Sequence, residues 1–143
     1  MRGFSLIELL VTLGIAGVLS GIALPSYHHT LQRAQRQDAR LALLRIQHFQ
    51  ERHFAEHLRY AGRLPAPAGA ESLGLDVLSD AGSYELSVQA DAAGLGYTAL
   101  ARVHGRQSGD RDCAVLTLDQ SGRRGSEDAG GNRLLPDTGR CWN

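Results

Sequence analysis

A single carboxylate, Glu8, lies in an otherwise apolar stretch that runs from Phe4 to Leu24. As a helix, this stretch would span roughly 30 Å, which is enough to cross the hydrocarbon core of a membrane. A charged side chain inside a membrane costs at least roughly 2.5–3.5 kcal/mol, so such residues usually pair with an opposite charge. The stretch itself contains no basic residue. A cut between Gly3 and Phe4 would create a suitable cation, the free amine of Phe4.

Two other groups of residues have the side chains that metal sites use. His53-Phe-Ala-Glu56-His57 matches the H-x-x-E-H zinc pattern by letter, and histidines four residues apart share one face of a helix. A hydrolase also needs a third ligand and a cleft, so we interpret these histidines as ordinary residues near the end of an amphipathic helix. Four aspartates could suggest calcium, but their spacing matches no EF-hand loop; they are Asp76, Asp80, Asp110 and Asp112. We therefore predict no metal, no cofactor and no enzymatic activity.

The basic residues are all arginines, and 15 of them balance 15 acidic residues. Arginine suits phosphate groups, so a basic stripe in the C-terminal part could bind DNA. Acidic residues alternate with these arginines nearly one for one, which favours a solvated surface of mixed charge. The arginines in question are Arg102, Arg106, Arg111, Arg123, Arg124, Arg133 and Arg140.

Both cysteines, Cys113 and Cys141, lie in the C-terminal third of the chain. If the domain is outside the cytoplasm, they predict a disulfide; the alternative is a pair of buried thiols. On the chain-entropy account such a disulfide is worth about 3.5 kcal/mol.

The N-terminal residues carry a specific family resemblance. Gly3-Phe4-Ser5-Leu6-Ile7-Glu8, followed by the apolar run and Pro25, resembles the N-terminal signature of type IV pilins and related pseudopilins. The resemblance implies that a prepilin peptidase cuts after Gly3 and methylates the new N-terminal residue, Phe4. It also implies that Glu8 attracts the N-terminal amine of a neighbouring subunit during assembly, and that the helix can bend near Pro25. Gly17 and Gly21 form a GxxxG pair, which permits close helix contact; the alternative is ordinary membrane-helix glycine.

The rest of the chain predicts a helix followed by a sheet. From Ser26 to about Tyr60 there is no glycine or proline, so the helix should continue until Gly62 ends it. One helix face is assigned to the core and consists of Ala39, Ala42, Leu43, Ile46, Phe49 and Phe54. Leu41 and Leu44 fall on the opposite side, where either neighbouring subunits or a loop of the same chain would cover them.

Alternating or apolar segments at 84–89, 96–103 and 113–119 predict antiparallel strands, and residues 123–140 read as irregular. Together with the resemblance, the expected fold is α+β, the pilin fold. A long N-terminal helix, half membrane segment and half amphipathic, packs on a sheet of three or four antiparallel strands with a disulfide-bounded C-terminal loop. The expected segments are a leader (1–3), a transmembrane and assembly helix (4–27), an amphipathic helix (28–61), a connecting loop (62–83) and the sheet region (84–143).

The resemblance further implies a structural subunit of a type IV pilus. The segments around Cys113 and Cys141-Trp142 resemble PilE-like minor pilins, which act in pilus assembly, twitching motility, adhesion or competence. A type II secretion pseudopilin and a DNA-uptake receptor pilin are the alternatives. The implied partners are other pilin subunits, the prepilin peptidase and the assembly machinery. The protein would sit in the inner membrane with a cytoplasmic N-terminus and then in the extracellular pilus.

Overall fold

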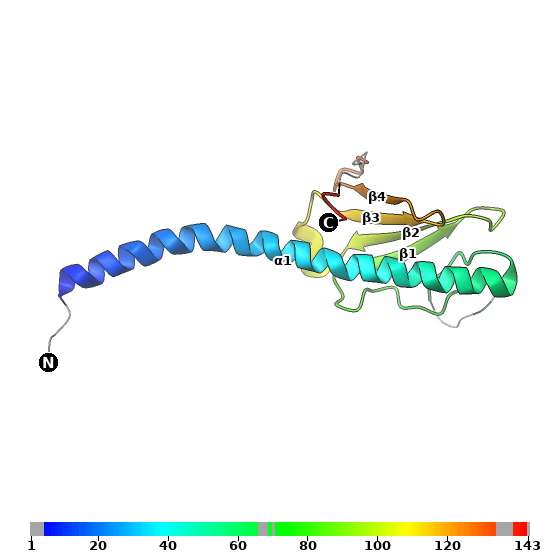
Figure 1. Cartoon of the computed structure of the whole chain (residues 1–143), viewed down its shortest axis with the longest axis horizontal. Coiled ribbons are helices and arrows are strands. Elements are labelled where there is room, and N and C mark those ends of the chain that lie inside the picture. The colour runs from blue at the N-terminus through cyan, green and yellow to red at the C-terminus, as the bar shows by residue number, and fades with distance from the viewer. Residues whose placement is uncertain (1–4, 66–68, 70, 134–138, 143) are drawn as a thin grey trace. The chain divides into compact units, whose positions relative to one another are not determined.

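The computed structural model describes residues 5–65, 69, 71–133 and 139–142, without the side chains of 22–26, 28 and 29 (Figure 1). It divides into two compact units, Met1–Arg33 and Ala34–Asn143. One helix, α1 (Leu6–His57), belongs to both units. Four strands and a short 3₁₀ helix follow it: β1 (Tyr84–Ala90), β2 (Tyr97–Val103), η1 (Gly105–Gly109), β3 (Val115–Asp119) and β4 (Arg124–Glu127).

Helix α1 is continuous through Pro25 and ends at His57, before the expected end at 61. Leu58 stops it by adopting a left-handed conformation, with φ of 56°. The side chain of Gln50 then fixes the reversed chain, because it donates to the Ala61 carbonyl at 2.7 Å and accepts from the Ala61 N–H at 2.9 Å. This turn depends on the buried amide of Gln50 and not on Gly62. The end of the helix was therefore predicted a few residues too late.

The strands form one antiparallel sheet in the order β1-β2-β3-β4, as expected. Strand β4 lies in the segment read as irregular. Its sequence, Arg-Gly-Ser-Glu, has no hydrophobic alternation. It pairs with β3, with Leu116 opposite Ser126, so the tertiary partner and not local propensity makes it a strand.

The core lies between the sheet and the second part of α1. Ala39, Leu43 and Ile46 are at most 1% exposed, as the helix periodicity predicted. Ala42 and Phe49 are partly buried against the same core. The other buried members come from the loop, the strands and the C-terminal segment, among them Leu64, Leu73, Tyr84, Leu86, Val88, Tyr97, Ala99, Ala101, Leu116, Leu118 and Trp142.

Leu41 and Leu44 are 67% and 45% exposed, so no described loop residue covers them as one alternative required. Their apolar surface remains available to another chain.

The predicted Cys113–Cys141 disulfide is present, and its Cα atoms lie 5.7 Å apart. Both cysteines are fully buried. The bond joins the start of the β3 segment to the C-terminal segment, where the Trp142 indole also donates to the Gly125 carbonyl at 2.9 Å. The disulfide therefore holds the C-terminal segment against the sheet.

Replacing both Cys113 and Cys141 by alanine should lower the free energy of unfolding by about 3.5 kcal/mol, because the unfolded chain regains the freedom of the closed loop. Urea denaturation of the full chain in detergent measures this change. Reduction of the unmodified chain is the matched control and should give a similar loss. A loss below about 1 kcal/mol in both experiments would contradict the stabilising role of the bond.

Candidate functional site

The first part of α1 is an exposed apolar surface. Every described side chain from 5 to 21 is exposed. Nine large apolar side chains between 6 and 19 are 55–75% exposed: Leu6, Ile7, Leu9, Leu10, Val11, Leu13, Ile15, Val18 and Leu19. Burying each one is worth roughly 1.5–3 kcal/mol. A surface of this kind marks a site of interaction with an apolar partner.

Three glycines interrupt this surface. A Cβ atom added at Gly14, Gly17 or Gly21 would meet nothing within 4 Å. Such residues let another helix approach closely, since no side chain separates the two backbones. The first part of α1 can therefore pack tightly against a second apolar helix.

Glu8 is in the first turn of α1, where the helix dipole favours a carboxylate. Its backbone N–H donates to the Ser5 carbonyl at 3.0 Å, but its side chain makes no hydrogen bond or ion pair with a described residue. Among the residues that the structure describes, this apolar surface thus carries one negative charge without an opposite charge paired to it. Gly3 and Phe4, the predicted processing residues, lie outside the described residues, so the pairing of Glu8 with a Phe4 amine remains a prediction.

Pro25 lies within α1, and its side chain is outside the described part of the structure. Its predicted role in bending the helix also remains a prediction. Within the described residues, no helix is both long enough and apolar enough to cross a membrane.

A buried ion pair lies near the start of the second unit, Ala34–Asn143. The sequence pattern did not predict this pair. Arg36 of α1 donates from Nε to Asp110 Oδ2 at 2.7 Å and from Nη2 to Asp110 Oδ1 at 2.8 Å. The hydrogen bond to Asp110 raises the pKa of Arg36 above its usual value. Arg36 also donates to the Arg140 carbonyl at 3.1 Å. One side chain therefore ties α1 to the segment after η1 and to the C-terminal segment.

Three more polar side chains complete this network. Gln107 Nε2 donates to Asp110 Oδ2 and to the Tyr84 hydroxyl, both at 3.1 Å. Burial raises the pKa of Tyr84 to about 12, so its hydroxyl stays protonated near neutral pH. Arg40 Nη2 donates to the Cys141 carbonyl at 3.3 Å. The network positions the disulfide region relative to α1.

A signal for these residues was present in the sequence. Arg36, Gln50 and His53 are buried polar residues that lie on the same three- and four-residue steps as Ala39, Leu43 and Ile46. Polar residues at core positions of a helix indicate specific hydrogen-bond partners elsewhere in the chain. What the sequence could not supply is the identity of those partners.

The histidine pair is part of this packing. His53 Nδ1 lies 2.8 Å from the Arg59 carbonyl and Nε2 lies 3.0 Å from the Gly69 carbonyl. The His57 ring stacks on it at 4.2 Å between centroids. Both nitrogens of His53 are engaged by the main chain, which supports its interpretation as a structural residue. Among the described residues, no three His, Cys, Asp or Glu side chains gather as metal ligands would.

Three of the C-terminal arginines, Arg123, Arg124 and Arg133, line a polar groove of about 340 Å³ beside β3 and β4. Arg123 pairs with Asp119 at 3.0 Å and Arg133 with Glu127 at 3.7 Å. Partial burial opposes ionisation of Asp119, but hydrogen bonds from Ser121 and Arg123 outweigh it and lower the pKa of Asp119. The groove therefore holds both arginines and carboxylates, and two of its three arginines are paired.

Two family models match consecutive parts of the chain, from residue 1 to residue 117. A family model described as "Prokaryotic N-terminal methylation motif" matches residues 1–24. A second, described as "Type IV minor pilin ComP, DNA uptake sequence receptor", matches residues 25–117. The chain is similar to the type IV major pilin protein PilA of Myxococcus xanthus (strain DK1622), with 32% identity over 94 residues, 63% of this chain and 43% of PilA.

It is also similar to the fimbrial protein EcpC of Eikenella corrodens, with 33% identity over 93 residues, 65% of this chain and 56% of EcpC. The chain thus spans about half the length of the curated relatives it matches. Among solved structures, a type IV pilin from Shewanella oneidensis matches with a TM-score of 0.52 and 23% identity, over 78% of this chain and 98% of that one. This last likeness supports the fold.

Proposed function

We propose that this chain is a structural subunit of a type IV pilus. The premise is that the chain belongs to the type IV pilin family and to the minor-pilin group matched over residues 25–117. The observation that carries the proposal is the first part of α1, with its large exposed apolar surface and its single carboxylate, Glu8, which pairs with no described residue. Such a surface must be covered by lipid or by other apolar helices, and in a filament outside the membrane other helices must cover it. A helical bundle of identical or related subunits supplies that cover.

Processing precedes assembly in this proposal. The chain is cut after Gly3, and Phe4 becomes a methylated N-terminal residue; the methylation-motif match at residues 1–24 supports this step. The chain is a substrate of the prepilin peptidase and performs no catalysis itself. Before assembly it resides at the inner membrane, with its N-terminus in the cytoplasm. The assembly machinery then moves it into the pilus.

Within the pilus, the amine of Phe4 on one subunit pairs with Glu8 of a neighbour. The pair leaves neither charge without a partner in the apolar interior. It also sets the stagger between subunits, since a wrong register leaves both charges unpaired. The open faces of Gly14, Gly17 and Gly21 support close packing of neighbouring helices.

Deleting the gene and scoring pili, protein secretion and transformation separately tests the function. If the chain is a pilus subunit, its deletion should change the number or the function of pili and leave protein secretion normal. Loss of secretion with normal pili would favour a type II secretion pseudopilin. The abundance of the chain in sheared pili, measured by mass spectrometry, distinguishes a minor pilin from a major pilin. We expect the low abundance of a minor pilin.

DNA binding is a second candidate function, because the matched family model is described as a DNA uptake sequence receptor. In the polar groove, phosphates would find the guanidinium groups of Arg123 and Arg133, which both lie beyond the matched residues. Both arginines already pair with carboxylates, so DNA would have to compete with those pairs.

If DNA binds in this groove, replacing both Arg123 and Arg133 by alanine should weaken binding. The slope of log K against log salt should also become shallower by about 2, because two phosphate contacts are lost. Gel shifts of the full chain in detergent at several salt concentrations measure both quantities. Arg45 and Arg52, replaced together on α1, are the matched control. Equal binding by both double variants would rule out the groove.

A further inference from the structure

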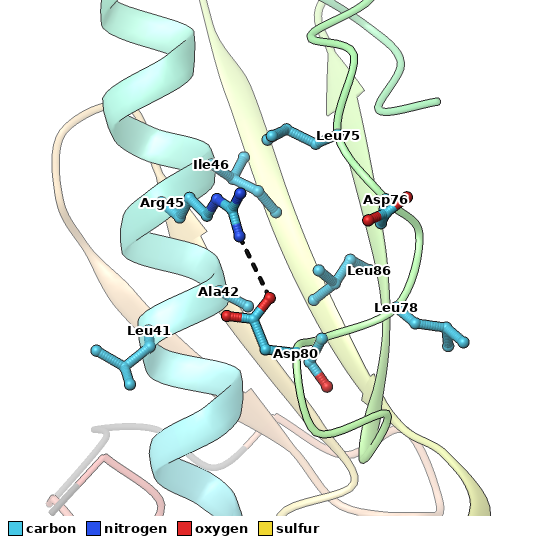
Figure 2. A pocket seen from close by; sticks show the side chains of 10 residues that line it. Leu41, Ala42, Arg45, Ile46, Leu75, Asp76, Leu78, Asp80 and Leu86 are labelled. Carbon is cyan, nitrogen blue, oxygen red and sulfur yellow. Dashed lines mark hydrogen bonds and ion pairs between the residues drawn. The ribbon is translucent and has the colours of Figure 1, made fainter. Parts of the chain in front are cut away.

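A hollow of about 260 Å³ lies between α1 and the loop that precedes β1. Figure 2 shows Ile46, Leu75 and Leu86 pointing into this space, between the helix and the loop. Arg45 and Asp80 form an ion pair across it at 3.2 Å, and both side chains are more than half exposed. Such an exposed pair contributes roughly 0–1 kcal/mol, so it can open without large cost.

The rim of this hollow is apolar and acidic. Leu41 and Leu78, which both line the hollow, are 67% and 41% exposed. Asp76 is exposed beside them, and its carboxylate makes no ion pair with a described residue. We call the hollow with this rim the acidic groove. It suits a partner that presents an apolar side chain next to a positive charge.

The same chain presents such a surface at the end of α1. Leu58 and Leu95 are 76% and 64% exposed, the first just after the helix and the second in the β1–β2 turn. The Tyr60 N–H donates to the Gly94 carbonyl at 2.8 Å and brings the two segments together. Arg59 lies against Gly94, with its Cβ 3.1 Å from where a Gly94 Cβ would be. We call Leu58, Arg59 and Leu95 the basic tip.

The carboxylate of Asp91, in the same turn as Leu95, is engaged by the main chain of that turn. Asp91 of the same turn accepts a hydrogen bond from the Leu95 N–H at 2.9 Å, and its carboxylate also faces Gly96. The Arg59 side chain forms no ion pair within the described residues. The tip and the groove are therefore complementary both in apolar surface and in charge.

The two surfaces cannot meet within one molecule. The α1 residues that line the groove run from Leu41 to Ile46, 17 to 12 positions before Leu58. At 1.5 Å per residue this places the groove and the tip roughly 18–25 Å apart along the helix. A contact between two different surfaces is heterologous, and when its rotation does not close it produces an open helical polymer.

From this complementarity we infer that the basic tip of one copy docks in the acidic groove of a second copy in the pilus. Leu95 covers Leu78 at the rim, and Arg59 approaches Asp76. The inference rests on the proposed function and adds a specific contact between globular units. It predicts that copies of this chain occur next to one another in the pilus and are not dispersed singly.

Cysteine crosslinking tests the contact in the full chain. Leu78→Cys and Leu95→Cys variants, co-expressed in pilus-producing cells, should give a disulfide-linked dimer in sheared pili after mild oxidation. The native cysteines do not interfere, because they are buried and bonded to each other. Leu44→Cys with Leu95→Cys is the matched control: Leu44 is an exposed leucine of α1 but does not line the groove, so little dimer should form.

The possible results separate the contact from the function. If both variants are present in pili but the L78C and L95C pair gives no more dimer than the control pair, the contact is wrong and the pilus function stands. If the unmodified chain is absent from pili, both are wrong.

A charge exchange gives an independent readout of the same contact. Arg59→Asp should lower the yield of dimer several-fold, and Arg59→Asp combined with Asp76→Arg should restore it. Both residues are exposed, so neither change should disturb folding. Failure of the second change to restore the dimer would overturn the pairing of Arg59 with Asp76.

Discussion

Replacing Glu8 by glutamine should reduce incorporation of the chain into pili by about a hundredfold. Glutamine keeps the size and hydrogen-bonding capacity of the side chain and removes only its charge. The Phe4 amine of the neighbouring subunit would then be left without a partner in an apolar bundle. A buried unpaired charge of this kind costs at least roughly 2.5–3.5 kcal/mol, and each 1.4 kcal/mol is a factor of ten.

The ratio of the chain in sheared pili to the chain in cells, measured by immunoblot, gives the incorporation. Glu8→Asp keeps the charge and should retain much of the incorporation. Glu56→Gln removes a carboxylate from the exposed end of α1 and should have no effect. Equal incorporation of the Glu8→Gln and Glu56→Gln variants would show that the charge of Glu8 has no role in assembly.

Asp110→Ala should lower the free energy of unfolding by about 3–5 kcal/mol, because it leaves the buried guanidinium of Arg36 without its partner. The Arg36 and Asp110 side chains are 10% and 2% exposed, so water cannot replace the lost contact. Urea or thermal denaturation of the full chain in detergent measures the change.

Asp80→Ala is the matched control, since it removes the carboxylate of an exposed pair with Arg45. It should cost no more than about 1 kcal/mol. Replacing both Arg36 and Asp110, as Arg36→Met with Asp110→Leu, should recover much of the stability because no buried charge remains. If Asp110→Ala cost no more than Asp80→Ala, the pair would contribute little to the fold.

Repeating patterns made much of the fold predictable from the sequence. The apolar steps Ala39, Leu43 and Ile46 identified the core face of α1, and polar–apolar alternation located β1. The cysteine pair predicted the disulfide because the expected export made a bond favourable. Each of these inferences needed only local spacing or composition.

Features that depend on distant partners could not be predicted. Arg36 needs Asp110 and Gln50 needs Ala61, and no local pattern connects these residues. Strand β4 has no alternation of its own and forms because β3 provides a ladder. The end of α1 was placed late because Leu58 takes a backbone conformation that leucine rarely adopts.

The candidate site divides in the same way. The apolar run, its glycines and Glu8 were evident from residue types, and the structure shows them exposed on one helix. The complementary groove and tip were not evident, because they combine residues from α1, two loops and β1. Surfaces of this kind exist only after the chain has folded.

The most direct test of the account is the intact mass and N-terminal sequence of the chain recovered from sheared pili. We expect a polypeptide that begins at N-methylated Phe4, with Cys113 and Cys141 joined. A chain that reaches pili still beginning at Met1, or one that is processed but never found in pili, would contradict assembly through a processed N-terminal helix.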